Sequence, residues 1–316
     1  MAERRHIVLT GGTSGIGLEA ARLLLQAGDR LTVLCRNGAA AAALRQQLGG
    51  VLSTPLCDLA DLQSVARCAH GLLEAGNPID TLVLNAGLQY TGATQPRWSV
   101  QGYELTIAVN HLAHQALLMQ LLPLLHQASA PRLVVTASEV HDPSTPGGGV
   151  GAPAGLGQLD GLRQGPGAVM LDGHSRFNAD KAYKDSKLCN VLMARQAARQ
   201  QSMPVLAWSP GLVIPRSTGG FFRDSRRHNP IGQAVFALVA RDLLKVTETA
   251  TRAGALLAAL ASDAAYGTPG FQYWSNRVLG PGRLRFERRE PSLEASADAL
   301  AESLWQLSAQ ATGLQG

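Results

Sequence analysis

Residues 6–17 read His-Ile-Val-Leu-Thr-Gly-Gly-Thr-Ser-Gly-Ile-Gly, and an apolar helical pattern follows as far as Leu25. The first five of these residues predict a short buried strand, so the order is strand, glycine turn and helix. Gly11 allows the tight turn, Gly15 lets the backbone approach a pyrophosphate, and Gly17 lets the helix pack against the strand. Unpaired N–H groups at the helix N-terminus would then face the anion. The stretch predicts a dinucleotide site, and an ordinary glycine-rich loop is the alternative.

The second predicted strand, 30–35, ends at Arg36 and Asn37, where a cofactor with a free ribose 2′-hydroxyl usually meets Asp or Glu. A guanidinium binds a 2′-phosphate bidentately and a carboxylate would repel it, so Arg36 favours NADP over NAD. A solvated surface arginine is the alternative. Asp58, followed by Leu59, ends a third strand and could accept a hydrogen bond from the adenine amine. A plain helix N-cap is the other interpretation of Asp58.

Tyr183 and Lys187 lie four residues apart in Ala-Tyr-Lys-Asp-Ser-Lys-Leu-Cys-Asn, so a helix would place both side chains on one face. A free phenol has a pKa of about 10 and moves protons poorly at neutral pH unless a nearby cation stabilises its phenolate. Lys187 is placed to be that cation. The pair is a candidate proton-transfer site, and a solvated pair on an exposed face is the alternative.

The composition fits one large α/β domain. The chain has 316 residues, of which 46% are hydrophobic and 16% charged, so it can bury a full core. The net charge of +5 comes without a lysine-rich run and with little aromatic interleaving, so nucleic-acid binding is not indicated. An anionic cofactor would account for part of the charge. The four cysteines, at 35, 57, 68 and 189, lack metal-ligand spacing and are expected to be reduced core residues, with no metal site.

No signal-peptide pattern precedes the first strand, and no apolar run reaches the length of a membrane span. We therefore expect a soluble, cytoplasmic protein. The stretch 230–244 is an apolar helical pattern directly after the basic residues 223–227. An amphipathic helix over the substrate cleft is the favoured interpretation, and peripheral membrane contact is the alternative.

Alternating strand and helix patterns through the first two-thirds of the chain predict a doubly wound parallel sheet of the Rossmann type. The expected strands are 6–10, 31–35, near 51–57, 80–84, 132–137 and 204–209, and the expected helices are 16–27, 38–48, 61–75, 101–127 and the one that carries Tyr183. Residues 1–316 would form a single domain with a substrate-side insert at 142–170, a lid at 214–250 and a helical tail at 285–316. The insert is rich in Gly and Pro and far longer than a usual connection, so it is expected to be functional or disordered.

Further motifs follow the glycine turn in a fixed order. They are Asn85-Ala86-Gly87 after a strand, Asn110 within Val-Asn-His, Ser138 after a strand, the Tyr183/Lys187 pair and Pro210-Gly211. Each could be an ordinary turn or strand-end residue, but together they closely resemble the short-chain dehydrogenase/reductase family.

The resemblance implies a role for each motif. Tyr183 would be the general acid in the reductive direction, and Lys187 would lower its pKa and hold the nicotinamide ribose. Ser138 would donate a hydrogen bond to the reacting group, and Asn110 would kink its helix and hold a water that links Lys187 to solvent. The hydride belongs to the cofactor, NADPH. The expected cofactor-binding residues are Gly11, Thr13, Ser14, Gly15, Ile16, Gly17, Arg36, Asn37, Asp58, Leu59, Asn85, Ala86, Gly87, Tyr183, Lys187, Pro210, Gly211 and Val213.

Within that family, the flanking sequence resembles the light-dependent protochlorophyllide oxidoreductases of chlorophyll biosynthesis and photosynthesis. The stretches that carry the likeness are 155–162, 171–173, 181–190, 273–275, 293–296 and 304–308. It implies that light excites bound protochlorophyllide, that hydride passes from NADPH to one carbon of its C17=C18 bond, and that Tyr183 protonates the other. A large planar tetrapyrrole would need a wide apolar cleft, for which residues 142–170 and 218–244 could supply walls.

Two departures keep other functions open. After Pro210-Gly211 those enzymes carry a cysteine where this chain has Leu212, and the segment 214–223 is longer than theirs. Ser138, with Val140-His141 after it, resembles the retinol-dehydrogenase branch, which reduces carbonyls in the dark. A light-independent carbonyl or alcohol oxidoreductase for a hydrophobic substrate is therefore the second hypothesis, and a non-catalytic NADPH- or pigment-binding protein is the third.

Members of the family often associate through two helices, which correspond to 101–127 and 183–200 in this chain. A homo-oligomer is therefore a further expectation.

Overall fold

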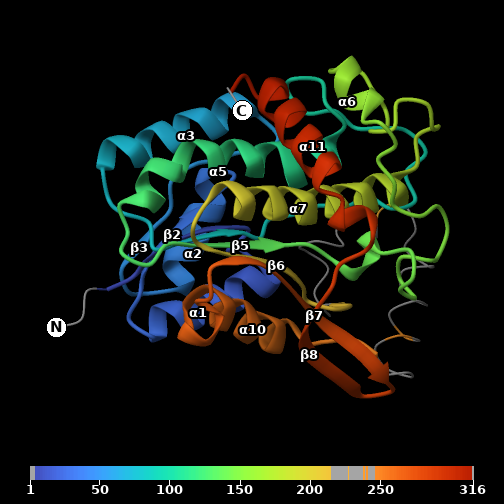
Figure 1. The fold of residues 1–316 in the computed structure, drawn as a ribbon. Helices are drawn as coiled ribbons and strands as arrows, with labels where there is room; N and C mark the ends of the chain where they lie inside the picture. Colours follow the sequence, from blue (N-terminus) through green and yellow to red (C-terminus); the bar gives the residue numbers. More distant parts are fainter. Residues whose placement is uncertain (1–3, 215–226, 228–237, 239, 241–245, 315–316) are drawn as a thin grey trace.

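The computed structural model describes residues 4–214, 227, 238, 240 and 246–314, and its centre is one eight-stranded sheet (Figure 1). The strand order is β3-β2-β1-β4-β5-β6-β7-β8, and every neighbouring pair is parallel except β7 and β8. The strands are β1 (His6–Thr10), β2 (Arg30–Leu34), β3 (Leu52–Ser53), β4 (Thr81–Leu84), β5 (Arg132–Thr136), β6 (Pro204–Ser209), β7 (Gly270–Gly280) and β8 (Arg283–Arg289). The Rossmann-type doubly wound sheet expected from the sequence is confirmed.

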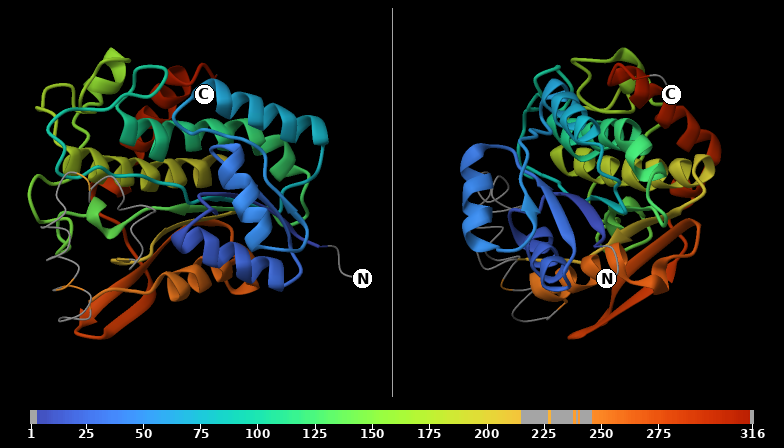
Figure 2. Two further views of the ribbon diagram at one scale, coloured as in Figure 1. Left: turned by 180° about the vertical axis from the view of Figure 1, so that it is seen from behind. Right: turned by 90° about the vertical axis from the view of Figure 1, so that its left-hand side faces the viewer.

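Alternate residues of each central strand point to opposite faces, and a separate layer of helices covers each face (Figures 1 and 2). In β1, Val8 packs with one layer, whereas Ile7 and Leu9 pack with the other. The first layer contains α3 (Leu62–Ala75), α5 (Ala113–His126), α7 (Ala179–Gln200) and α11 (Asp298–Ala311), and the second contains α1 (Gly15–Gln26), α2 (Gly38–Gln47) and α10 (Ala250–Ser262). Continuous apolar strands are thereby buried on both faces.

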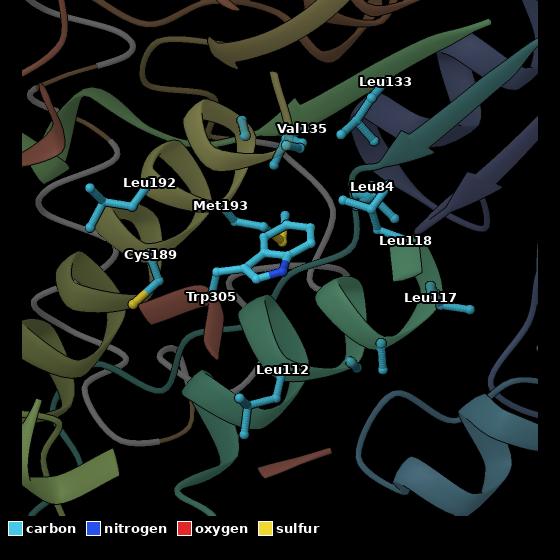
Figure 3. Close-up of a cluster of buried hydrophobic side chains, with 14 of the residues drawn as sticks. Leu84, Leu112, Leu117, Leu118, Leu133, Val135, Cys189, Leu192, Met193 and Trp305 are labelled. Carbon is cyan, nitrogen blue, oxygen red and sulfur yellow. The ribbon is translucent and has the colours of Figure 1, made fainter. Parts of the chain in front are cut away.

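The larger core cluster lies between the sheet and the first layer, and Trp305 of α11 sits inside it. Figure 3 shows the indole among side chains of α5 and α7, such as Leu118 and Met193, and of β5, such as Val135. Only 4% of Trp305 is exposed, and Leu304 beside it is fully buried. The described part of the C-terminal tail therefore belongs to the core of the domain.

The predicted helix at 101–127 begins later and is interrupted. Residues Leu105–Ile107 form α4, residues Ala108–Leu112 form the π-helical turn η1, and α5 follows. The Glu104 carboxylate caps the start by accepting hydrogen bonds from the N–H groups of Thr106 and Ile107, both at 3.0 Å. A π turn widens the helix and breaks its regular bonding, and such turns often mark functional sites.

The predicted strand near 51–57 is also shorter than expected. Only Leu52–Ser53 pair continuously with β2, and a single bridge from Cys35 to Leu56 continues the contact. Pro55 interrupts the ladder because proline has no backbone N–H to donate.

The insert is ordered and contains the short helix α6 (Asp160–Gln164). The 3-10 turn η2 (Glu139–His141) precedes it, and α7 follows it. The tail does not become helical at residue 285, because residues 283–289 form β8; η5 (Glu294–Ser296) and α11 come later. Most of the lid expected at 214–250 and of the helix expected at 230–244 lies outside the described residues.

Candidate active site

The predicted site residues come together at one edge of the sheet. Gly11 follows β1, Asn85 follows β4, Ser138 comes two residues after β5, and Pro210 follows β6. These four strands are adjacent and parallel, so their carboxyl ends meet at the same edge. That edge is where open α/β sheets bind ligands.

The glycine turn has the geometry that a dinucleotide requires. Gly11 and Gly15 have positive φ angles of 71° and 56°, which other residues rarely adopt. A Cβ atom on Gly17 would lie 2.2 Å from the carbonyl oxygen of Gly11, so only glycine allows this close packing. A Cβ on Gly15 would meet no atom within 4 Å, which leaves that side of the turn open to a ligand. Ser14, the N-cap of α1, makes no side-chain cap and is exposed, whereas Thr13 and Ile16 are half-buried.

The loop after β4 is fastened to this turn by Thr10. The Thr10 hydroxyl accepts hydrogen bonds from the N–H groups of Asn85 at 2.8 Å and Ala86 at 2.9 Å. The Asn85 side chain donates to the Thr10 carbonyl at 3.2 Å and accepts from the Thr136 hydroxyl at 3.1 Å. Asn85 therefore links the ends of three strands, and it is more than a turn residue.

On the expected ribose side, Arg36 is exposed directly beyond the carboxyl end of β2. Asn37 is the N-cap of α2, and its side-chain oxygen accepts a hydrogen bond from the N–H of Ala40 at 2.9 Å. The guanidinium is therefore open to an anion, whereas the Asn37 side-chain oxygen is already engaged.

Asp58 and Leu59 are half-buried beyond β3. The Asp58 carboxylate accepts a hydrogen bond from the N–H of Ala60 at 3.0 Å, whereas Asp61 caps α3 by accepting from the N–H of Gln63 at 3.0 Å. The interpretation of Asp58 as a helix N-cap is wrong, and a contact with adenine stays a prediction.

Ser138 and Tyr183 are hydrogen-bonded to one another, although they are 45 positions apart in the chain. Ser138 is held as the N-cap of η2, and Tyr183 lies in the second turn of α7. Burial raises the pKa of Tyr183, and the hydrogen bond with Ser138 opposes that rise. The two hydroxyls therefore offer adjacent hydrogen-bonding groups to one substrate atom.

Lys187 is buried under Tyr183. Its Nζ donates a hydrogen bond to the Thr136 carbonyl at 3.1 Å and lies 5.6 Å from the centroid of the Tyr183 ring. Burial lowers the pKa of Lys187 to about 8. In this structure the interaction that lowers the Tyr183 pKa is the one with Ser138, so the corresponding role of Lys187 stays a prediction.

Asn110 lies in the π turn η1 and is fully buried. Its amide donates to the Leu88 carbonyl and to the Ser186 hydroxyl, both at 3.0 Å, and its oxygen accepts from the Leu88 N–H at 2.8 Å. A Cβ on Gly87 would lie 3.5 Å from both the Asn110 oxygen and the Lys187 Nζ. Asn110 thus joins the loop after β4 to α7 beside Lys187, in a helix whose regular bonding is broken.

The loop after β6 forms the opposite wall. Gly211 has a φ of 76°, and a Cβ there would lie 2.7 Å from the carbonyl oxygen of Asn276. The Asn276 amide donates to the Pro210 carbonyl at 3.2 Å and to Glu248 at 2.9 Å. Val213 is half-buried and forms an isolated bridge with Glu248. Pro210, Gly211 and Val213 are therefore held in place by Asn276 of β7 and by Glu248, which precedes α10.

Sequence reasoning missed several residues that build the site. His114 bonds to Thr10 at 3.0 Å and to the Asn110 carbonyl at 3.0 Å, and its place four residues after Asn110 in a helix was a usable signal. Asn276 and Glu248 gave no signal, because their contacts to the loop after β6 depend on distant parts of the chain.

The residues present fit an anionic dinucleotide. The open N-terminus of α1, the space beside Gly15 and the exposed guanidinium of Arg36 lie along one edge of the sheet, as phosphate groups would require. The Ser138 and Tyr183 hydroxyls and the Lys187 ammonium lie near the middle of the same edge. This arrangement can hold a nicotinamide cofactor and deliver a proton beside it.

Within the described ranges, no helix combines the length and the apolar character that a membrane crossing requires.

Comparison with known proteins supports the interpretation of this site as one that binds a nicotinamide cofactor. The family model described as short chain dehydrogenase matches residues 5–150. Protochlorophyllide reductase A, chloroplastic, of Oryza sativa subsp. japonica is 33% identical over 322 aligned positions, which cover 98% of this chain and 80% of that protein. Protochlorophyllide reductase of Avena sativa is 32% identical, with 98% of this chain and 99% of that protein covered.

Solved structures share the fold. A putative uncharacterized protein from Mycobacterium paratuberculosis superposes with a TM-score of 0.69 at 26% identity and covers 98% of this chain and 94% of that one. Pseudomonas aeruginosa RhlG, in an NADP active-site complex, has a TM-score of 0.60 at 23% identity, over 86% of this chain and 94% of that one. Together with the full-length sequence similarity and the Ser138–Tyr183–Lys187 geometry, these matches establish that the chain belongs to the short-chain dehydrogenase/reductase family of oxidoreductases.

Proposed function

We propose that the chain is an NADPH-dependent reductase of the protochlorophyllide reductase type. The observation that carries the proposal is the similarity to plant protochlorophyllide reductases over 98% of the chain, which includes the insert between Ser138 and Tyr183. That insert borders the predicted proton donor, so it is the segment where a substrate preference would be encoded.

Arg36 supports NADPH over NADH. Its guanidinium is exposed beyond β2, where a 2′-phosphate would lie, and Arg–phosphate hydrogen bonds are charge-assisted and bidentate. The cofactor would supply the hydride. We expect turnover with NADPH to exceed that with NADH, and equal turnover would contradict this assignment.

Tyr183 would deliver the proton. The phenol is protonated at neutral pH, and burial raises its pKa further, so it needs a cation beside it to give its proton to a carbon or oxygen that has gained hydride. Ser138 would orient the substrate atom through its hydroxyl. Lys187, whose ammonium lies 5.6 Å from the centroid of the phenol ring, would stabilise the phenolate that remains.

A paired light and dark assay tests the proposal. Purified protein with NADPH and protochlorophyllide should give a chlorophyllide absorbance band after illumination and none in darkness. No band after illumination would reject the protochlorophyllide reductase assignment, provided that NADPH binding is shown in the same sample.

A specific observation favours a second function, a light-independent reductase for a hydrophobic carbonyl. The Ser138 and Tyr183 hydroxyls are within hydrogen-bond distance of each other, so a carbonyl oxygen that replaced their mutual bond could accept a hydrogen bond from each. Leu212 also replaces a cysteine that we expect in the protochlorophyllide enzymes. This function predicts NADPH consumption in darkness with retinal or another apolar carbonyl, and loss of that activity in Tyr183→Phe.

A further inference from the structure

The segment 142–178 starts just after the Ser138 turn and ends at the helix that carries Tyr183, so both of its ends adjoin the candidate active site. One large apolar side chain in this segment, Val150, is 74% exposed. A single exposed valine is common on protein surfaces, but one in the segment that joins the Ser138 turn to the Tyr183 helix is available for contact with an apolar ligand.

Lys184, the residue after Tyr183, anchors the backbone around Val150. Its Nζ donates hydrogen bonds to the carbonyls of Gly148 and Ala152, both at 3.0 Å, and also to the carbonyl of Val150. An ammonium has three donors, and here all three meet backbone acceptors of one loop. Lys184 is only 6% exposed, and burial lowers its pKa while the charges of Asp180 and Asp185 oppose that shift.

The same loop packs directly on the residues after Ser138. The Thr145 hydroxyl donates to the carbonyls of Glu139 at 3.0 Å and Asp142 at 2.8 Å. A Cβ on Gly148 would lie 1.9 Å from the Asp142 carbonyl oxygen, so the loop has no room for a side chain there. Residues 145–152 therefore form a rigid loop between the Ser138 turn and α7.

A second lysine fixes the chain that leaves this loop. The Lys181 Nζ donates to the Gly155 carbonyl at 2.7 Å and to the Asp185 carboxylate at 2.6 Å. The other Asp185 oxygen accepts from the Gly155 N–H at 3.0 Å. Lys181, Lys184 and Asp185 surround Tyr183 in the sequence, so one helix holds both the proton donor and the insert.

We propose that Lys184 is a positioning residue that holds loop 145–152 as one wall of the substrate cleft, with Val150 as an apolar contact for the substrate. The inference rests on the proposed function only in that the substrate is a large apolar molecule. Because Lys184 follows Tyr183 directly, the wall and the proton donor keep a fixed spacing. The substrate class that an apolar contact at Val150 fits is a large apolar molecule.

Lys184→Met tests the anchor, because methionine fills similar volume but cannot donate to three carbonyls. Arg195→Met is the matched control: Arg195 lies on the same helix, and its Nε contacts Asp298 at 2.6 Å, away from the insert. Native-state digestion with thermolysin, which cleaves before apolar residues, should cut the Lys184→Met protein before Val150, while the wild type and Arg195→Met resist. Equal resistance of all three overturns the anchor, and equal cleavage of both variants shows general loosening of α7, which also overturns it.

Val150→Asp tests the contact, and the exposed position makes the variant safe for folding. Protochlorophyllide is titrated in darkness onto NADPH-loaded protein, and its affinity should fall about tenfold in Val150→Asp and in Lys184→Met, with NADPH affinity unchanged. If an activity is found, KM for the apolar substrate should rise while kcat stays the same. Equal pigment affinity in wild type and Val150→Asp overturns the contact. Val150-dependent pigment binding with no chlorophyllide formed in light would reject the proposed function and leave the wall in place.

Discussion

Two halves of the sheet are joined in different ways. In the half expected to bind the cofactor, called the cofactor half, residues 6–84, α1, α2 and α3 follow β1, β2 and β3 after connections of four, three and eight residues, and β1 to β4 pair only with strands of this half or with β5. In the half expected to bind the substrate, called the substrate half, residues 132–311, long segments separate β5, β6 and β7, β8 reverses direction, and α11 returns to cover α7. The first half depends on local turns and caps, whereas the second depends on contacts between residues far apart in the chain.

Tyr183 belongs to the substrate half, and its loss should have the largest effect on turnover. Tyr183→Phe removes the proton donor and should lower kcat by about 100-fold or more, because a positioned general acid contributes on that scale. NADPH affinity and the unfolding free energy should change little, since the ring is kept. Single-turnover kinetics measure the rate of the chemical step, and NADPH fluorescence measures the affinity for the cofactor. Activity within about threefold of wild type would exclude Tyr183 as a catalytic residue.

Trp305→Ala should destabilise the substrate half. The indole is 4% exposed within the core of the first helical layer, so its truncation should cost about 3–5 kcal/mol of unfolding free energy. Leu293→Ala is the control, because Leu293 is 94% exposed and its truncation should stay within about 0.5 kcal/mol. Urea unfolding measures both, and similar losses in the two variants would mean that α11 is not part of the core.

Gly17→Ala should disrupt the glycine turn of the cofactor half. The new Cβ would lie 2.2 Å from the Gly11 carbonyl oxygen, so the turn must shift, at about 1–3 kcal/mol, and NADPH binding should be lost. Gly71→Ala provides the contrast, because a Cβ there meets nothing within 4 Å in an exposed part of α3. That variant should be stabilised by up to about 1 kcal/mol and keep its NADPH affinity.

The smallest expected effect is the change of unfolding free energy and of kcat/KM with pH. The pKa of Lys187 is about 8 in the folded protein and higher in the unfolded chain, so above pH 8 the unfolded state binds more protons and stability should rise with pH. Activity that needs the ammonium should fall over the same range, so kcat/KM and unfolding free energy should move in opposite directions. Lys187→Met should abolish the rise in stability, and a wild-type kcat/KM that stays level from pH 7 to 10 would contradict the role of the charge.

The same two halves differ in how much of their structure could be predicted from the sequence. Some parts of the site were predictable because each lies at a strand end or in a regular helix. They are the glycine turn, Asn85, Ser138, Tyr183 and Pro210. The strand near 51–57 was predicted too long because Pro55 cannot donate to a ladder. A kink at Asn110 was expected from the family resemblance, but the later helix start and the π turn were not predicted, since a π turn leaves no clear pattern in an apolar sequence.

The substrate half was less predictable for a physical reason. Strand β8 reads Arg-Leu-Arg-Phe-Glu-Arg-Arg, which is too polar to be recognised as part of a sheet, and it is an edge strand with most of its arginines exposed. Trp305 and Lys184 act through partners at other places in the chain, such as Met193 and Gly148, and no local spacing shows such pairs.

The position of α11 also has a consequence for synthesis on the ribosome. About 98 residues separate the end of α7 from the start of α11, which corresponds to roughly 5–20 s of translation. During that interval the nascent chain exposes the apolar surfaces of α5 and α7 that Trp305 later covers. A chaperone would bind the emerging protein at those surfaces. If translation stalled before α11, the glycine turn would already be formed, but the exposed apolar surfaces would make the intermediate prone to aggregation.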